Sequence, residues 1–452
     1  MVIGGAFALT VGNPANNLSS SFSGVISGGA TAGLTKAGAG TFTLAGTNAY
    51  GGVTTISAGT LALGNPAALG AAGSAISLGG GALSLATDTS VNAYTTTVTA
   101  SSMVISGRAT AGAGLTHTLG GLSIGAQTLS VTSGVNVTSG TAGLVLGPVT
   151  LSVNGTVFDV ARNVDLTFGP LAGAFSFTKQ NGGRLLLNSA SARAGGTATL
   201  AGGTLVLGHT NGLGTAAAAL QLNGGILELA SDTGGAGHGT TVGGATAIVL
   251  NRATSGPAIT NTLGTLTIGP YALSIMAGGN VASGVPGLTF GVTTMSGNPT
   301  FTTAAGTLLT LGGLQDGGVT PRMITKAGAG TLNLGTLAGS LIGGTRVNIA
   351  EGTLNANQAT ALGALAAVDV ADGATFGVGA SQTIGALSNV GSTLNSGSVS
   401  INGAYTLTVG GVNNLSSVFS GVISGASGML TKAGTGTLTL SGANTYGGAT
   451  TN

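Results

Sequence analysis

A long internal repeat is the feature that most constrains this chain. The segment GTLALGNPAALG, which begins at Gly59, returns at Gly203 as GTLVLGHTNGLG. The segment RATAGAGLTHTLGG, which begins at Arg108, returns at Arg252 as RATSGPAITNTLGT, again after 144 positions. Because self-similarity at a fixed long period is typical of stacked structural units, a repetitive architecture takes precedence over any local interpretation.

The repeats divide the chain into four consecutive segments of one continuous β-solenoid. We expect a partial first repeat over residues 1–58, repeat unit 1 over 59–202, repeat unit 2 over 203–351 and a shorter third repeat over 352–452. The third repeat opens with GTLNANQATALG, a looser copy of the same motif.

Apolar residues alternate with polar ones at a period of two, as in Leu61 and Leu63 or Leu83 and Leu85. This alternation predicts short strands, and the glycines between them supply corners. A sandwich of sheets would alternate too, but it would not repeat so long a unit. We therefore predict an all-β fold, a parallel β-helix of about 20 rungs and on the order of 100 Å in length, given strands roughly 4.8 Å apart.

Charge is scarce, with 11 basic and 9 acidic residues among 452 and a net charge of +2. Because no run of Lys or Arg is present to neutralise successive phosphates, nucleic acid is not an expected partner. No apolar stretch reaches the roughly 18 residues of a membrane-spanning helix, and the start at Met1 does not resemble a secretion signal. We expect membrane attachment and any export signal to lie outside this chain.

One motif carries a family resemblance. FSGVISG at Phe22, followed by LTKAGAGTFTLAGTNAYGGVTTISAGTLALG at Leu34, resembles the passenger-associated repeat of bacterial autotransporters. The likeness is nearly as good over Phe419 to Asn452 and looser around Lys326. It implies an extracellular, right-handed parallel β-helix that belongs to a larger passenger, commonly an adhesin, an aggregation factor or a structural filament, and it implies no enzyme.

The sequence departs from the motif in the two middle copies. Both lack the Asn-x-Tyr element, which is present as Asn48/Tyr50 and Asn444/Tyr446. KQNGGRLLL, which begins at Lys179 with Gln180 following, has Arg184 where Thr41 and Thr331 stand in the other copies. We expect irregular rungs there.

We predict no catalytic, cofactor-binding or metal-binding residue. Hydrolysis of a glycoside needs two carboxylates roughly 5 to 10 Å apart, and the closest pairs in sequence are interpreted as ordinary turn acids. These pairs are Asp159/Asp165, Glu228/Asp232 and Asp369/Asp372. Three histidines, His117, His209 and His238, lack the spacing of metal ligands and are interpreted as surface residues.

Three other patterns receive structural interpretations. Lys36, Lys326 and Lys432 share one motif position and are predicted to solubilise a corner; the competing interpretation is a row that binds a ligand. Tyr50 is predicted to pack over a corner with its hydroxyl in water. Thr-x-Thr pairs such as that at Thr41 could order water on a flat face, but their uneven spacing argues against an ice-binding role.

These observations favour an extracellular structural or adhesive passenger at the bacterial outer surface. Its expected partners are other copies of itself or a cell or abiotic surface, with no small-molecule substrate. One alternative is a subunit of an end-to-end filament, because residues 5–55 and 403–452 carry halves of the same motif. A carbohydrate-active β-helix enzyme is the other alternative, and two carboxylates meeting in a groove would distinguish it.

Overall fold

The computed structural model describes residues 1–13, 15, 17–70, 74–318, 320–335, 337–389, 396–411 and 414–452. Regular secondary structure in this described part is β-strand throughout, without a helix, and the paired strands run parallel. The chain divides into two compact units, Met1–Ala219 and Leu220–Asn452. Each unit is a parallel β-solenoid, and together they contain about 20 turns, which confirms the predicted fold class.

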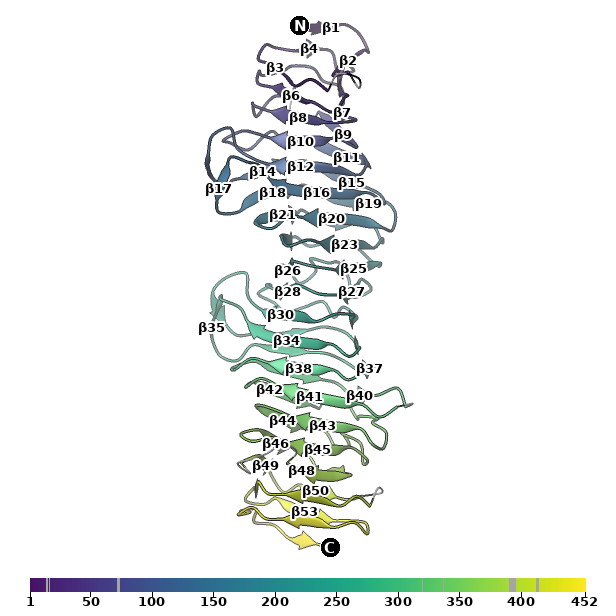
Figure 1. Cartoon of the computed structure of the whole chain (residues 1–452), viewed down its shortest axis with the longest axis vertical. Coiled ribbons are helices and arrows are strands. Elements are labelled where there is room, and N and C mark those ends of the chain that lie inside the picture. The colour runs from purple at the N-terminus through teal and green to yellow at the C-terminus, as the bar shows by residue number, and fades with distance from the viewer. Residues whose placement is uncertain are drawn as a thin grey trace. The chain divides into compact units, whose positions relative to one another are not determined.

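In unit 1 three parallel sheets form the sides of the solenoid, as the purple to teal strands of Figure 1 show. The first sheet contains β2 (Ala8–Val11), β5 (Gly33–Lys36), β7 (Thr54–Ile56), β9 (Ala75–Gly79), β11 (Thr95–Ala100), β15 (Leu122–Ile124), β19 (Val149–Leu151) and β22 (Leu171–Ala172). The second contains β3 (Ser20–Phe22), β6 (Thr41–Leu44), β8 (Thr60–Leu63), β10 (Ala82–Leu85), β12 (Ser102–Ser106), β16 (Thr128–Ser133), β20 (Thr156–Val160), β23 (Phe177–Gln180) and β25 (Thr197–Leu200). The third contains β14 (Thr116–Leu119), β18 (Ala142–Leu146), β21 (Val164–Phe168), β24 (Arg184–Leu187) and β26 (Thr204–Leu207). Two short pairs complete the unit, β1 (Val2–Ile3) with β4 (Ser27–Gly28) and β13 (Gly112–Ala113) with β17 (Val137–Ser139).

Unit 2 is built in the same way. One sheet contains β27 (Ala219–Leu222), β29 (Thr240–Val242), β33 (Leu266–Ile268), β37 (Thr293–Met295) and β40 (Leu314–Gln315). A second contains β28 (Ile226–Leu229), β30 (Thr246–Leu250), β34 (Ala272–Ala277), β38 (Thr300–Thr303), β41 (Met323–Ala327), β43 (Arg346–Ile349), β45 (Ala367–Val370) and β48 (Ala386–Ser388). A third contains β32 (Thr260–Thr262), β36 (Gly287–Thr289), β39 (Leu308–Leu311), β42 (Thr331–Leu334), β44 (Thr353–Ala356), β46 (Thr375–Val378), β49 (Ser398–Ile401) and β52 (Val422–Ser424).

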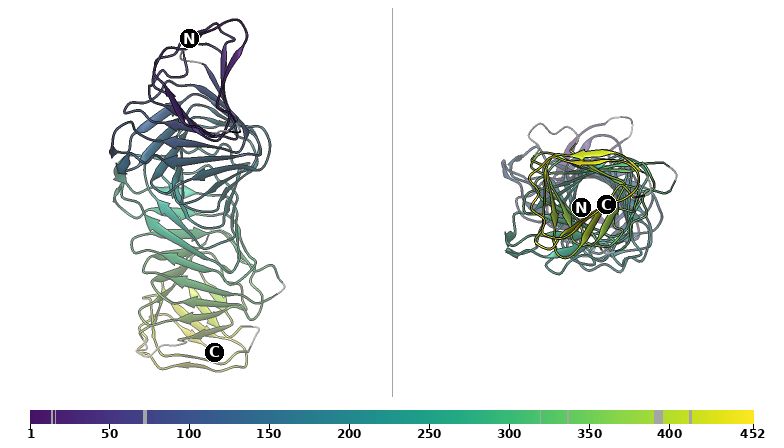
Figure 2. Two further views of the ribbon diagram at one scale, coloured as in Figure 1. Left: turned by 45° about the horizontal axis from the view of Figure 1, so that its top comes forward. Right: turned by 90° about the horizontal axis from the view of Figure 1, so that it is seen from below.

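The remaining strands of unit 2 form smaller sheets. They are β47 (Gln382–Ile384) with β50 (Thr406–Val409), β53 (Met429–Lys432) and β55 (Thr450–Thr451); β51 (Ser417–Phe419) with β54 (Leu438–Leu440); and β31 (Gly256–Pro257) with β35 (Val281–Ser283). Viewed from below, the yellow turns of this unit run round a closed outline with strands on its sides (Figure 2).

The core of each unit consists of apolar columns in strand register. In unit 1 one column runs through Phe42, Leu61, Leu83, Val104, Val131 and Val160. In unit 2 another runs through Leu309, Leu332, Leu354, Phe376, Val399 and Ile423. All of these side chains are buried, and full burial of each contributes roughly 1.5–3 kcal/mol. The two-residue alternation in the sequence therefore places the same chemistry inside every turn.

Candidate functional site

Every lysine of the chain occupies the same position of the repeat motif, on strands that belong to different sheets. The four are Lys36 on β5, Lys179 on β23, Lys326 on β41 and Lys432 on β53. Strand alternation points each lysine to the same side as the apolar residue two positions earlier, so the side chain faces the interior. The first three are at most 1% exposed, whereas Lys432 is partly exposed. The prediction that this position solubilises a corner is wrong for the three buried lysines.

Three main-chain carbonyls hold each buried ammonium group. Lys36 Nζ donates to the carbonyl oxygens of Ala37 at 2.9 Å, Gly38 at 2.7 Å and Ala58 at 3.1 Å. The first two acceptors belong to the turn that follows the lysine. The third belongs to the next turn of the solenoid.

The second copy repeats this geometry despite its different sequence. Lys179 Nζ donates to the carbonyls of Gln180 at 2.9 Å, Asn181 at 2.8 Å and Gly202 at 3.0 Å. Asn181 has a positive φ of 64° where the first copy has Gly38 at 72°. Since Asn tolerates the left-handed region better than most residues, KQN makes the same turn as KAG. The rung predicted to be irregular therefore keeps the lysine site.

The third copy places Lys326 against the carbonyls of Ala327, Gly328 and Glu351, the last at 2.9 Å. The fourth places Lys432 against those of Ala433 and Gly434. Among the ion pairs of the described residues none involves a lysine, so the hydrogen-bond acceptors of these cations are carbonyl oxygens, while the charges of Asp159 and Glu351 act on Lys179 and Lys326 from a longer distance. Burial lowers the pKa of Lys36, and it lowers the pKa of Lys179 and of Lys326 to about 8.

Glycine closes the site from the next turn. Gly203 and Gly352 follow the third carbonyl and have φ values of 67° and 69°. A Cβ atom would lie 2.7 Å from Lys179 Nζ at Gly203 and 2.9 Å from Lys326 Nζ at Gly352. Carbonyl oxygens of the preceding turn would lie nearer still, at 2.3 to 2.5 Å, so the glycine of the GTL motif allows the two turns to approach closely around the lysine.

An asparagine and a tyrosine join further turns in the first copy. Asn48 accepts a hydrogen bond from the Ile26 amide at 2.7 Å and donates to the Ala68 carbonyl at 2.5 Å, in the turns on either side. Tyr50 is fully buried, and its hydroxyl lies 2.8 Å from Thr54 Oγ1. The expectation that this hydroxyl lies in water is wrong. Burial raises the pKa of Tyr50.

Outside the core, unit 1 carries a row of hydroxyl groups, here called the hydroxyl row. Its members lie in register on the outward side of the first sheet and are all solvent-accessible: Thr10, Thr35, Thr55, Ser77, Thr97, Ser123 and Thr150. Neighbours are one strand apart, roughly 4.8 Å. The spacing looks uneven in sequence because the turns differ in length, but strand pairing makes the row regular in space.

The hydroxyl row is free of charge and open to a partner. Within the described part of the chain, no side chain of the row forms a hydrogen bond with another protein group. Two shallow depressions of about 280 and 310 Å³ flank Thr97, Ser123 and Thr150. Unit 2 has a comparable outward row on its third sheet, made by Thr262, Thr289, Thr310, Asn333 and Asn355.

Comparison with known proteins identifies the segments around the lysines. The family model of the passenger-associated-transport-repeat matches residues 34–63, 177–207, 324–356 and 430–451. Each match contains one lysine. The chain carries the passenger repeat of autotransporters. Neither a curated protein nor a solved structure matches the chain.

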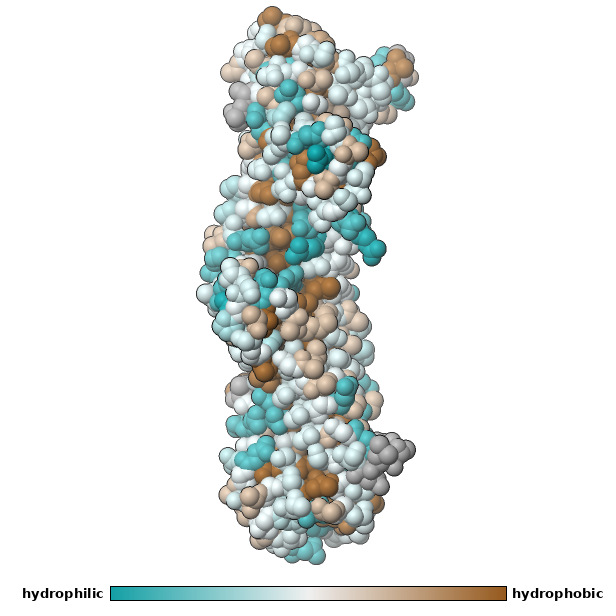
Figure 3. Space-filling model, turned by 90° about the vertical axis from the view of Figure 1, so that its left-hand side faces the viewer, coloured by the Kyte–Doolittle hydropathy of each residue, from teal (hydrophilic) through white to brown (hydrophobic). Residues whose placement is uncertain are grey.

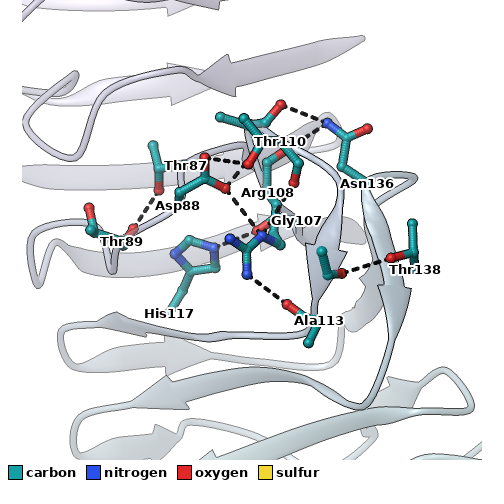
Figure 4. A network of polar contacts seen from close by, with 12 residues as sticks. Thr87, Asp88, Thr89, Gly107, Arg108, Thr110, Ala113, His117, Asn136 and Thr138 are labelled. Carbon is teal, nitrogen blue, oxygen red and sulfur yellow. Dashed lines mark hydrogen bonds and ion pairs between the residues drawn. The ribbon is translucent and has the colours of Figure 1, made fainter.

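Between the first two passenger repeats, an arm leaves the stack of unit 1. The first arm comprises residues 108–114 and 134–141 and includes the β13–β17 pair. Arg108 donates to Asp88 at 3.2 Å and to the carbonyl of Ala113 at 2.8 Å, and Figure 4 shows this clamp at the base of the arm. Asn136 bridges the two sides by donating to the Arg108 carbonyl at 3.0 Å. Hydrogen bonds from Thr110, together with Arg108, lower the pKa of Asp88.

The second arm, residues 252–258 and 278–285 in unit 2, has the same clamp. Arg252 donates to Asp232 at 3.0 Å and to the Pro257 carbonyl at 2.6 Å. Asn280 donates to the Arg252 carbonyl at 2.8 Å. The hydrogen bond from Thr254 is the main reason why the pKa of Asp232 is lowered, with Arg252 contributing.

The histidines differ from the surface residues that the sequence predicts. His117, at the base of the first arm, is fully buried, and its Nε2 lies 2.9 Å from the Gly107 carbonyl while Nδ1 has no partner. His238 is also buried, and His209 is half-buried. Burial lowers the pKa of His117. Among the described residues no three His, Asp or Glu side chains gather as a metal site would require.

The acidic pairs considered from the sequence bind other groups. Glu228 accepts from Asn251 at 2.6 Å, and Asp165 pairs with Arg184 at 3.3 Å. Asp369 is buried and accepts from Arg346 and Ser388. Asp159, Asp165, Glu228 and Asp369 lie on strands, so their interpretation as turn acids is wrong.

The described part of the chain contains no helix able to cross a bilayer.

Proposed function

We propose that this passenger segment is a non-catalytic structural or adhesive element of the bacterial outer surface, which associates with copies of itself or with another surface. The hydroxyl row carries the proposal. Each hydroxyl can donate and accept a hydrogen bond, so such a row can pair with a second row without needing complementary charges. The passenger repeat, whose family suggests a secreted or surface-exposed protein, supports this location.

The low charge of the chain removes the usual barrier to association. Most of the face in Figure 3 is pale, the colour of intermediate hydropathy, with only scattered teal and brown. A net charge of +2 over 452 residues leaves little long-range repulsion between copies. Contact of the hydroxyl row with a second surface would replace the water at regularly spaced hydroxyl groups. Many weak hydrogen bonds would then form at the same time.

The test places charge in the row. Thr55→Lys, Thr97→Lys and Thr150→Lys are combined, and clustering is followed by light scattering of purified protein and by aggregation of coated beads. We expect clustering to be lost because like charges would face each other. The control combines Thr43→Lys, Thr178→Lys and Thr199→Lys on the second sheet, which adds the same charge elsewhere and should leave clustering intact.

Two results would contradict the proposal. One is an unaltered protein that stays dispersed and binds neither cells nor an inert surface. The other is equal loss of clustering in both triple variants, which would assign the effect to net charge rather than to the row.

A further inference from the structure

We infer that the buried lysine of a passenger repeat is a latch between consecutive turns of the solenoid, that is, a set of hydrogen bonds that becomes complete only when the following turn is in place. The inference does not depend on the proposed adhesive role, because it concerns how one turn is held to the next. It applies to Lys36, Lys179 and Lys326, whose ammonium groups are buried.

The sequence distances of the three acceptors carry the first step. Two carbonyls lie one and two residues after the lysine, so they are in place as soon as the local turn forms. The third lies 22, 23 and 25 residues further on in the three copies. A lysine that has only its own turn therefore has an incomplete set of acceptors, as Lys432 has with two carbonyls and a partly exposed side chain, and burying it in that state would be unfavourable. Arrival of the next turn completes the set.

The chemistry of the ammonium group carries the second step. It has three N–H donors directed away from one nitrogen, which match three converging carbonyls. A guanidinium group is planar and larger, and a methionine of similar length has no donor at all. Removing the lysine would leave three inward carbonyls without a donor.

The neighbouring glycines carry the third step. A Cβ at Gly203 or Gly352 would lie 2.3 to 2.5 Å from carbonyl oxygens of the preceding turn and 2.7 to 2.9 Å from the ammonium nitrogen. The next turn thus packs closely against both the lysine turn and its ammonium group, and the positive φ of these residues reserves the position for glycine.

The first experiment measures cooperative unfolding in urea by circular dichroism. Lys326→Met keeps the length and apolar stem but removes the donors, and we expect the equilibrium constant for unfolding to rise at least about tenfold. Thr325→Val, on the outward side of the same strand, is the matched control. Equal effects of the two substitutions would overturn the inference.

Rescue separates the donors from the charge. In Lys326→Ala, n-propylammonium should restore part of the lost stability because it can offer the same three donors to the carbonyls. Tetramethylammonium has the same charge and no N–H donor, so it should not. Rescue by both ions, or by neither, would contradict a latch built from directed hydrogen bonds.

Labelling of the unaltered protein covers the case in which the variants do not fold. Because the four lysines are the only amines besides the N-terminus, an amine-reactive ester reports on each latch separately. We expect Lys432 to be modified at once, and Lys36, Lys179 and Lys326 at least about a hundredfold more slowly, since modification of a buried amine requires opening. Equal rates at all four lysines in the folded protein would overturn the inference.

Discussion

The two arms share one construction and differ in what they bury and display. In both, an aspartate, an arginine and an asparagine close the base through equivalent contacts. The buried residue beneath is His117 in the first arm and Asn261 in the second, and both are almost inaccessible. Next to the bridging asparagine, Val135 is 98% exposed, while the equivalent position of the second arm is Gly279. The clamp residues, which are the same in both arms, hold each arm in shape. The positions that differ between the arms are the buried residue beneath and the exposed residue beside the asparagine.

Breaking the clamp should have the largest effect, and it should be the same in both arms. Arg108→Ala and Arg252→Ala remove the cation that joins the aspartate to a carbonyl across the arm. Amide exchange of β13 and β17, or of β31 and β35, should become about tenfold faster, because the charge-assisted bonds at the base are lost. Amide exchange measured by mass spectrometry should stay unchanged in the turns that contain the buried lysines. A change there would contradict the idea that each clamp stabilises only its own arm.

Acid should distinguish the arms. Burial lowers the pKa of His117 below its ordinary value of 6.5, so the unfolded chain binds the proton more readily than the folded chain. The free energy of unfolding should therefore be at its full value above pH 6.5 and should decrease as the pH falls below it. Urea midpoints at pH 7.5 and 5.0 would measure this loss.

His117→Asn provides the internal control, because it gives the first arm the residue of the second. The free energy of unfolding of this variant should decrease less between pH 7.5 and 5.0. Opening of the second arm, followed by amide exchange, should not change over the same pH range. An undiminished decrease in the variant would show that another group controls the acid sensitivity.

The exposed position beside the bridging asparagine should contribute least to stability. Val135→Gly exchanges the exposed side chain of the first arm for the residue of the second, and we expect the free energy of unfolding to change by less than about 0.5 kcal/mol. Thermal unfolding would measure it. A larger loss would mean that Val135 holds the arm in shape, which would weaken the distinction between the clamp residues and the exposed position beside them.

Most of the fold can be predicted from the sequence because alternation and the repeat specify the same architecture. Leu34 and Lys36 are two residues apart and both face inward, so alternation alone predicts a buried lysine. The usual exposure of charged residues predicts the opposite, and here alternation decides the position. The third carbonyl could not be predicted from local sequence, since Ala58 approaches Lys36 only through the stacking of turns. The regular spacing of the hydroxyl row could not be predicted either. The loops differ in length, so sequence distance does not show which threonines are neighbours in space. His117 is buried because it alternates with Leu119 on the inward side of β14 and lies in register with the core residue Leu144. Alternation indicates this position, but a histidine is not an expected member of an apolar column.

The closed base of each arm has a practical consequence. Since Asp88, Arg108 and Asn136 tie the exit and return of the chain together, the strands on either side keep their pairing whatever lies beyond the clamp. A foreign peptide grafted at Val135, which is almost fully exposed beside the clamp, would extend into solvent and leave the strand pairing in place. The chain could thus serve as a scaffold for antigens or enzymes, carrying cargo at two defined places along its length.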